Sequence, residues 1–247
     1  MPLADYHEGA FSLHACFTFF DSDNKPVAPT QEAVEQWKQS WGYASALLHK
    51  ATHGQMRIGT IRVGYADCPH ADAYMCQDHG DSKTPYVSKD RSYIHLADDA
   101  RTHPFVIIHE FGHYGLGIED EYRGGSDYVH DRTCTGDPRT HACIMEFSRD
   151  EGDKILDFRT GKLREGQVFE FCSPADHNLA TKKKSSLPPD NAQEELHHQS
   201  CWETIKKNYP RGAFGELRIP KTPFPEAGIA APEPIKWVDV TCPDGCK

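Results

Sequence analysis

Two histidines four residues apart, with a glutamate directly after the first, lie near the middle of the sequence in His109-Glu110-Phe111-Gly112-His113. On a helix, residues four apart project from nearly the same face, so both imidazoles can bind one metal ion. Glu110 would then lie beside the metal as the base that takes a proton from a water molecule. The spacing predicts a catalytic site with one zinc ion, at which a zinc-activated water hydrolyses peptide bonds.

A catalytic zinc site usually has three protein ligands and one open position, so a further ligand is expected after His113. If the helix continued, Asp120 would lie about 10 Å farther along its axis, too far to share the ion. Gly115 and Gly117 allow the chain to turn back, because glycine adopts the left-handed conformation that ends helices. Beyond them lies an acidic run that offers oxygen ligands.

The metzincin pattern narrows the choice of the third ligand within this acidic run. It places a glycine seven residues after the first histidine and the third ligand ten residues after it. Here Leu116 occupies that glycine position, and Gly117 follows one residue later. The same one-residue shift makes Asp120 the predicted third ligand, with Glu119 as the alternative.

The elements that must position these residues follow from hydrophobic patterning. The apolar run Pro104–Ile108 directly precedes the first histidine and predicts a helix that enters the core. Before it the sequence predicts, in chain order, a buried strand over 11–20, a helix from its cap Thr30 to Lys50, a strand over 56–65, a polar loop over 66–91 and a strand over 92–97. The segment Tyr93-Ile94-His95-Leu96 is the candidate edge strand for pairing with an extended substrate.

A methionine in a short apolar segment lies downstream, in Ala142-Cys143-Ile144-Met145-Glu146-Phe147. Metzincins have a Met-turn that forms a hydrophobic floor under the metal site. We therefore interpret Met145 as a candidate for that turn, although a methionine in such a run also serves as ordinary core packing.

The motif resembles a known family. The pattern His109-Glu110-x-x-His113-x-x-x-Gly117-x-x-Asp120-Glu121-Tyr122 is similar to the signature of the N-terminal metalloprotease domain of the calcium-activated chloride channel regulator (CLCA) family. Further similar segments follow in the same order, namely Phe169-Glu170-Phe171-Cys172, His177-Asn178 and Ser200-Cys201-Trp202-Glu203-Thr204-Ile205. The resemblance covers about residues 10 to 207.

This resemblance implies a metzincin-like zinc protease with His109, His113 and Asp120 as ligands and Glu110 as base. The expected fold is α+β, with a mixed twisted sheet and the motif helix in an N-terminal lobe and an irregular, disulfide-bearing C-terminal lobe. Family members carry a von Willebrand A domain after this region, but its Asp-x-Ser-x-Ser motif does not occur here. Autocleavage and any connection to channels are therefore not carried over, and we expect a shorter relative or a separate catalytic domain.

Length and charge limit the other possibilities. The 247 residues suit one two-lobed domain, and we expect an extension over 1–10, a catalytic domain over 11–209 with lobes of about 11–117 and 118–209, and a proline-rich tail or linker over 210–247. With 27 Lys and Arg against 37 Asp and Glu, the net charge of -10 argues against nucleic acid as a partner. No apolar run reaches membrane-spanning length, so no insertion into a membrane is expected. The expected partner is a protein or peptide substrate, and the oligomeric state is left open.

The nine cysteines favour an oxidising compartment, so a secreted, extracellular or periplasmic protein is expected, although the first eight residues do not resemble a signal peptide. Four pairs are candidate bridges and Cys16 is the remaining thiol, the pairs being Cys68–Cys76, Cys134–Cys143, Cys172–Cys201 and Cys242–Cys246. A structural zinc cluster is the competing interpretation, but no Cys-x-x-Cys spacing supports it.

Two other functions are compatible with these residues. The first is a secreted binding or adhesion module in which zinc only holds the lobes together, which an intact Glu110 argues against. The second is a gluzincin-type peptidase with a distant glutamate, such as Glu146, as its third ligand. A water-filled fourth position in an open cleft would favour catalysis, whereas a fourth protein ligand would favour a structural role.

Overall fold

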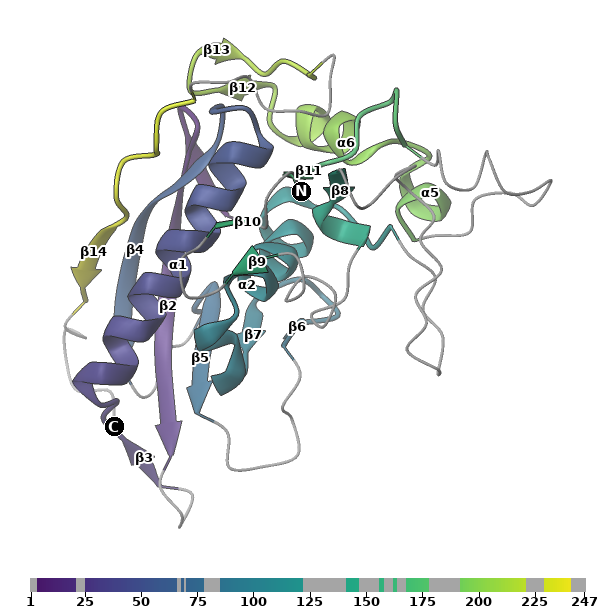
Figure 1. Ribbon diagram of the computed structural model, residues 1–247. Helices are drawn as coiled ribbons and strands as arrows, with labels where there is room; N and C mark the ends of the chain where they lie inside the picture. Colours follow the sequence, from purple (N-terminus) through teal and green to yellow (C-terminus); the bar gives the residue numbers. More distant parts are fainter. Residues whose placement is uncertain are drawn as a thin grey trace.

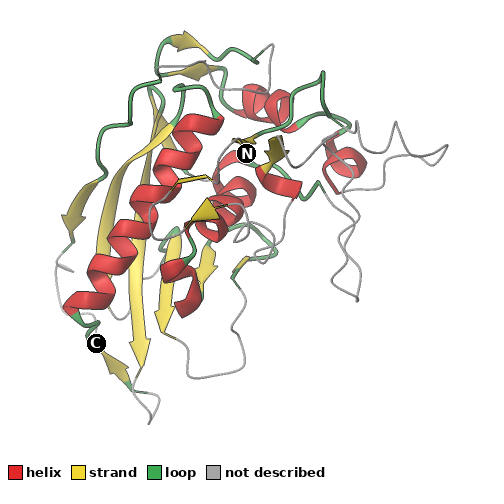
Figure 2. Ribbon diagram, in the orientation of Figure 1, coloured by secondary structure: helices red, strands yellow, loops and turns green. Residues whose placement is uncertain are grey.

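The structure is a computed structural model that describes residues 4–20, 25–65, 68, 70–77, 85–121, 141–146, 156–157, 162–163, 168–177, 192–220 and 229–240. It is a mixed α+β architecture, in which helices pack on a twisted sheet and smaller elements gather beyond the end of the motif helix (Figures 1 and 2). No helix in these ranges combines the length and the hydrophobicity that crossing a membrane requires.

The main sheet has eight strands and runs in the order β14-β4-β2-β5-β7-β6, with β1 and β3 pairing to the ends of β2. Its strands are β1 (Asp5–His7), β2 (Ala10–Phe20), β3 (Pro26–Val27), β4 (Arg57–Tyr65), β5 (Ala73–Gln77), β6 (Tyr86–Val87), β7 (Ile94–Leu96) and β14 (Lys236–Asp239). The neighbours along β14-β4-β2-β5-β7 are parallel, whereas β6 pairs with β7 in the antiparallel sense.

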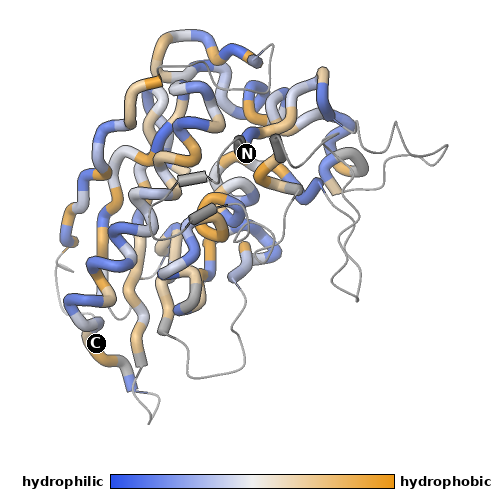
Figure 3. The backbone as a smooth tube through the Cα atoms, viewed as in Figure 1, coloured by the Kyte–Doolittle hydropathy of each residue, from blue (hydrophilic) through white to orange (hydrophobic). Residues whose placement is uncertain are grey.

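Helix α1 (Gln31–Ala51) covers one face of the sheet and confirms the predicted helix. The Thr30 side chain accepts a hydrogen bond from the backbone N–H of Ala33, which caps the first turn as predicted. Trp37 and Trp41 are fully buried on the face that packs against the sheet. The alternating orange and blue along α1 in Figure 3 shows this amphipathic pattern.

The other face of the sheet carries the disulfide Cys16–Cys68, which joins two positions 52 apart in the sequence. Cys16 is on the central strand β2 and packs with Ala71 and Tyr74, apart from the main core. The prediction that Cys16 is a leftover thiol is therefore wrong, and so is the predicted Cys68–Cys76 bridge. Spacing along the chain favoured the near pair, whereas the parallel pairing of β2 with β5 brings the distant one together.

The predicted polar loop over 66–91 is also corrected. It contains β5, which lies between β2 and β7, and β6, which ends the described sheet on that side. The segment over 93–96 was predicted as the edge strand, but β7 has neighbours on both sides. The edge position belongs to β6, whose two residues are too few to give a sequence signal.

In the described parts of the second half of the chain the elements are short. They are β8 (His141–Cys143), β9 (Leu156–Asp157), β10 (Lys162–Leu163), β11 (Val168–Glu170), α5 (Ala192–His197), α6 (Cys201–Asn208), β12 (Arg211–Gly212) and β13 (Gly215–Glu216). Ser200 and Glu203 form a capping box at the start of α6. The segment expected to be a tail also contributes β14 to the main sheet, while the domain boundaries themselves stay a prediction.

Candidate metal centre

The motif begins on helix α2 (Pro104–Phe111), which runs through the core beside α1 and is among the most hydrophobic stretches of the chain (Figure 3). Pro104 occupies the first turn, where its missing N–H costs no hydrogen bond. From Gly112 to Leu116 the backbone widens into a π-helical turn. Gly117 then has a φ of 70°, in the left-handed region, so the chain turns back as the sequence predicted.

The turn brings three predicted ligands together. The Nε2 atom of His109 lies 3.2 Å from Oδ1 of Asp120, and Nε2 of His113 lies 3.4 Å from the same oxygen. The two imidazole rings are 5.0 Å apart and nearly perpendicular. All three atoms are close enough to one another to bind a single metal ion.

The outer side of each histidine is held by the backbone. Nδ1 of His109 lies 3.1 Å from the carbonyl oxygen of Ile144, and Nδ1 of His113 lies 2.9 Å from that of Ile118. An Nδ1–H that donates to each carbonyl leaves Nε2 of the neutral ring as a bare acceptor. Two such nitrogens and a carboxylate oxygen then face one another, an arrangement that calls for a cation between them. The donor set therefore fits zinc.

The electrostatics follow from the same contacts. Burial lowers the pKa of His109, but Asp120 and Glu110 outweigh this effect and raise it to about 9. Burial works against ionisation of Asp120 as well, yet the two histidines hold the pKa of its carboxyl far below the usual range. Burial raises the pKa of Glu110. The carboxyl groups of Asp120 and Glu110 therefore favour positive charge at this site.

The three predicted ligands and Glu110 lie at the wall of a cavity of about 500 Å³. Along its other side runs the edge strand β6 with the turn after it, and Leu196 of α5 completes the lining, whose members are Pro85, Tyr86, Val87, Ser88, Lys89, Arg91, His109, Glu110, His113, Glu119, Asp120 and Leu196. A metal held by the three ligands would therefore face a space large enough for part of a peptide chain.

Glu119, the alternative third ligand, is turned toward other groups. Its carboxylate forms an ion pair with Arg91, and its backbone N–H donates to Oε1 of Gln193 at 2.8 Å. Of the two acids considered from the sequence, only Asp120 is placed against the histidines in the described contacts. The side chain of Glu146 lies outside the described residues.

The segment around Met145 lies directly against the motif. Met145 is fully buried, and a Cβ atom added to Gly112 would stand 2.6 Å from its sulfur. Gly112 is therefore needed where the methionine packs against the π-helical turn. The adjacent carbonyl of Ile144 is the one that accepts from His109, so this segment also orients a predicted ligand.

Sequence reasoning missed a second group of side chains behind this site. Cys172 and Cys201 were predicted to form a bridge, but they are not bonded to each other. Their sulfurs instead gather with Glu121 and Cys143. The signal for this was present only as an acid next to Asp120 and three scattered cysteines. The sulfur of Cys143 lies in this group, so its predicted bridge to Cys134 is also wrong. Cys242 and Cys246 lie outside the described residues, so their predicted pairing stays a prediction.

Comparison with known proteins adds little to this description. No family model and no curated protein matches the chain. Among solved structures it is similar to two of myroilysin, each 13% identical. The first has a TM-score of 0.30 and covers 85% of this chain and 87% of that chain, and the second has a TM-score of 0.27 with 84% and 96% covered. Such low TM-scores carry no functional argument, and the resemblance to the CLCA family stays a prediction.

Proposed function

We propose that this protein is a zinc-dependent endopeptidase with a metzincin-like catalytic centre. The observation that carries the proposal is the convergence of His109, His113 and Asp120 at the wall of a cavity that also contains Glu110. Three protein ligands beside an open space are typical of catalytic zinc sites, whereas structural sites are closed by a fourth ligand. Met145, packed beneath the turn, is proposed to be the Met-turn.

Zinc would be held by Nε2 of both histidines and the carboxylate of Asp120, and when bound it would supply Lewis acidity toward a water molecule and a substrate carbonyl. The carboxylate of Glu110 would accept a proton from that water and pass it to the departing amine nitrogen. The carbonyls of Ile144 and Ile118 keep each imidazole oriented, which fixes the direction of its metal-binding lone pair.

The edge strand β6 is proposed to bind the substrate backbone. The N–H of Ser88 donates to the carbonyl of Tyr93, which follows the turn and leads into β7. Because N–H groups alternate in direction along a strand, the N–H of Val87 points away from β7. Val87 lines the cavity, so an extended peptide could pair with it beside Glu110.

The remaining sequence predictions enter the proposal unchanged. We propose that the catalytic domain spans residues 11–209, with β14 added to its sheet, and expect the protein to be secreted, extracellular or periplasmic. The Cys16–Cys68 disulfide supports this location, because such bonds persist in oxidising compartments. A zinc-stabilised binding module is the second candidate, and a gluzincin-type site with Glu146 is the third. The position of Asp120 beside both histidines favours the metzincin-like arrangement over the gluzincin-type site. The open cavity beside the three residues favours catalysis over a structural zinc.

The test is the substitution Glu110→Gln. Loss of the base should lower peptide cleavage by about 100-fold or more, while the zinc content stays that of the wild type. Glu35→Gln, on the exposed side of α1, is the matched control and should cleave normally. Activity would be measured on a peptide library and zinc by elemental analysis. A zinc-loaded Glu110→Gln protein that cleaves as fast as the wild type would refute the assignment.

A further inference from the structure

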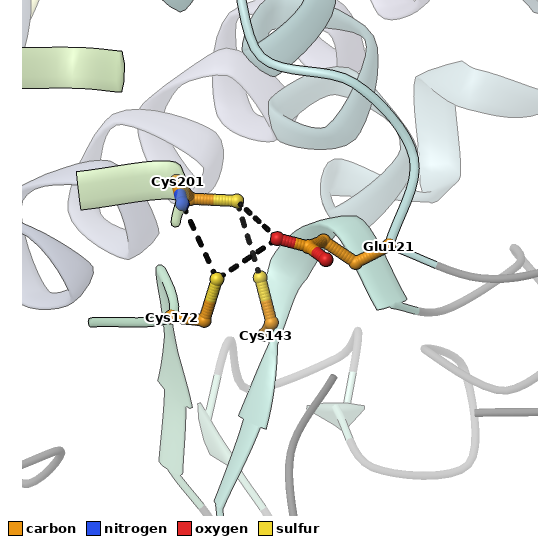
Figure 4. A group of neighbouring side chains, drawn as sticks. All are labelled: Glu121, Cys143, Cys172 and Cys201. Carbon is orange, nitrogen blue, oxygen red and sulfur yellow. Dashed lines mark hydrogen bonds between the residues drawn. The ribbon is translucent and has the colours of Figure 1, made fainter. Parts of the chain in front are cut away.

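Four acidic or thiol side chains meet behind the proposed catalytic centre (Figure 4). They are Glu121, which follows the π-helical turn, Cys143 at the end of β8, Cys172 just beyond β11, and Cys201 at the start of α6. All four are completely buried. We call this group the thiol cluster.

The distances within the thiol cluster are those of a metal-binding group. The sulfurs of Cys143 and Cys201 are 3.7 Å apart, and Oε1 of Glu121 lies 2.9 Å from the sulfur of Cys172 and 3.3 Å from that of Cys201. Around tetrahedral zinc, bond lengths of about 2.3 Å to sulfur and 2.0 Å to oxygen separate neighbouring ligand atoms by roughly 3.5 to 3.8 Å. Small shifts would therefore suffice to place an ion among them.

Burial makes this group costly without a cation. A carboxyl group and three thiols are all removed from water, so water cannot stabilise a carboxylate or a thiolate there. A divalent ion would stabilise the ionised forms of all four ligands at once. It would also keep three adjacent cysteines reduced in a compartment that forms the Cys16–Cys68 disulfide.

We propose that Glu121, Cys143, Cys172 and Cys201 form a second, closed zinc site with a structural role. It has four protein ligands and no exposed position, in contrast to the three-ligand site at the cavity. His177 would act as a positioning residue for the carboxylate, since its Nδ1 lies 3.1 Å from Oε1 of Glu121. This second site does not depend on the chain being a peptidase.

The location of the thiol cluster indicates what a bound ion would stabilise. Glu121 adjoins Asp120, and its backbone N–H donates to the carbonyl of Met145 at 2.8 Å. Cys143 directly precedes Ile144, whose carbonyl orients His109. An ion there would tie four separate segments together and hold both the third ligand and the floor of the cavity site in place.

Cobalt distinguishes the two sites by their ligands. Metal-free protein titrated with Co²⁺ should develop the near-ultraviolet charge-transfer band of cobalt bound to thiolates, which a His₂Asp site lacks. The double variant His109→Ala/His113→Ala should keep this band, and Cys172→Ser/Cys201→Ser should lose it. Zinc content should fall from about two ions per chain to about one in each variant. A wild type without the band would overturn the proposal.

A measurement on the unaltered protein covers the case in which the cysteine variants fail to fold. The zinc-loaded and chelator-treated proteins would be alkylated, and the modified peptides mapped by mass spectrometry. Cys143, Cys172 and Cys201 should be protected only when zinc is present. Equal labelling in both states, or a disulfide at any of these three cysteines in the zinc-loaded protein, would overturn the site.

The fourth ligand is tested by a conservative pair. Glu121→Gln should weaken zinc binding at the thiol cluster by about 10-fold or more, because a neutral amide replaces a charged ligand. His177→Gln should keep the cobalt–thiolate band and weaken binding less. The opposite order would overturn the assignment of Glu121 and make His177 the fourth ligand.

Discussion

Asp120 and Glu119 are adjacent acids whose side chains have different partners. Asp120 faces two imidazole nitrogens, whereas Glu119 forms an ion pair with Arg91 and supports the wall of the cavity. The Glu119–Arg91 pair is partly exposed, so its loss should cost at most about 1 kcal/mol of stability. The two acids therefore make a matched pair for mutagenesis.

Asp120→Ala should lose catalytic zinc, because two histidines alone leave the ion without its charged ligand. We expect the zinc affinity of that site to fall by at least about 100-fold. This exceeds the loss that is typical when a residue hydrogen-bonded to a metal ligand is replaced. Glu119→Ala should keep the ion. Elemental analysis after dialysis against a weak chelator measures both, and loss of zinc from Glu119→Ala alone would transfer the ligand role to it.

The residues proposed for the cavity site could be selected from the sequence because their signal is local. His109, Glu110 and His113 fall within five positions, and the displaced Gly117 located Asp120. The thiol cluster was not predictable in the same way, since its cysteines are separated by 29 and 58 residues along the chain. Only the folded chain shows which of the nine cysteines share one place.

At the scale of elements, long strongly patterned segments were predicted well and short ones poorly. Helix α1, strand β2 and strand β4 appear close to their expected bounds. The two-residue β6 and the π-helical turn left no periodic signal, because their conformations depend on neighbours brought from elsewhere. Yet β6 borders the cavity, so the least predictable strand is the one proposed to bind substrate.

Val87→Pro tests that strand. Proline removes the N–H that points away from β7, and an edge strand tolerates this loss. We expect kcat/KM for peptide substrates to fall about 3- to 10-fold, as for one lost hydrogen bond, with a Tm near that of the wild type. Val87→Ala keeps the N–H and is the control. Equal kcat/KM in the two variants would show that substrate does not pair with β6.

For the molecule as a whole, the sequence specified the mixed α+β class and the order of its main elements. It did not specify that a strand near the C-terminal end of the chain pairs with β4 in the main sheet. Strand β14 pairs with β4 although the paired residues, such as Lys236 and Thr60, are more than 170 positions apart in the sequence. Such pairing depends on the folded sheet offering an edge, which no local pattern encodes.

At this scale, the Cys16–Cys68 disulfide has the largest expected effect on the free energy of unfolding. It joins the central strand β2 to the segment between β4 and β5, and the closed loop includes all of α1. For a loop of this length the lost chain entropy of the unfolded state corresponds to roughly 4 kcal/mol. The double variant Cys16→Ala/Cys68→Ala should therefore unfold at a lower urea concentration, with a larger m-value because its unfolded chain is less compact.

Zinc content supplies the internal control for that experiment. The thiol cluster uses other cysteines, so the folded double variant should bind as much zinc as the wild type. Protein made in a reducing cytosol should lack the bond and show the same loss of stability, which is why we expect the native chain in an oxidising compartment. A double variant within about 1 kcal/mol of the wild type would argue that the disulfide does not constrain the unfolded chain and would remove this reason for expecting secretion.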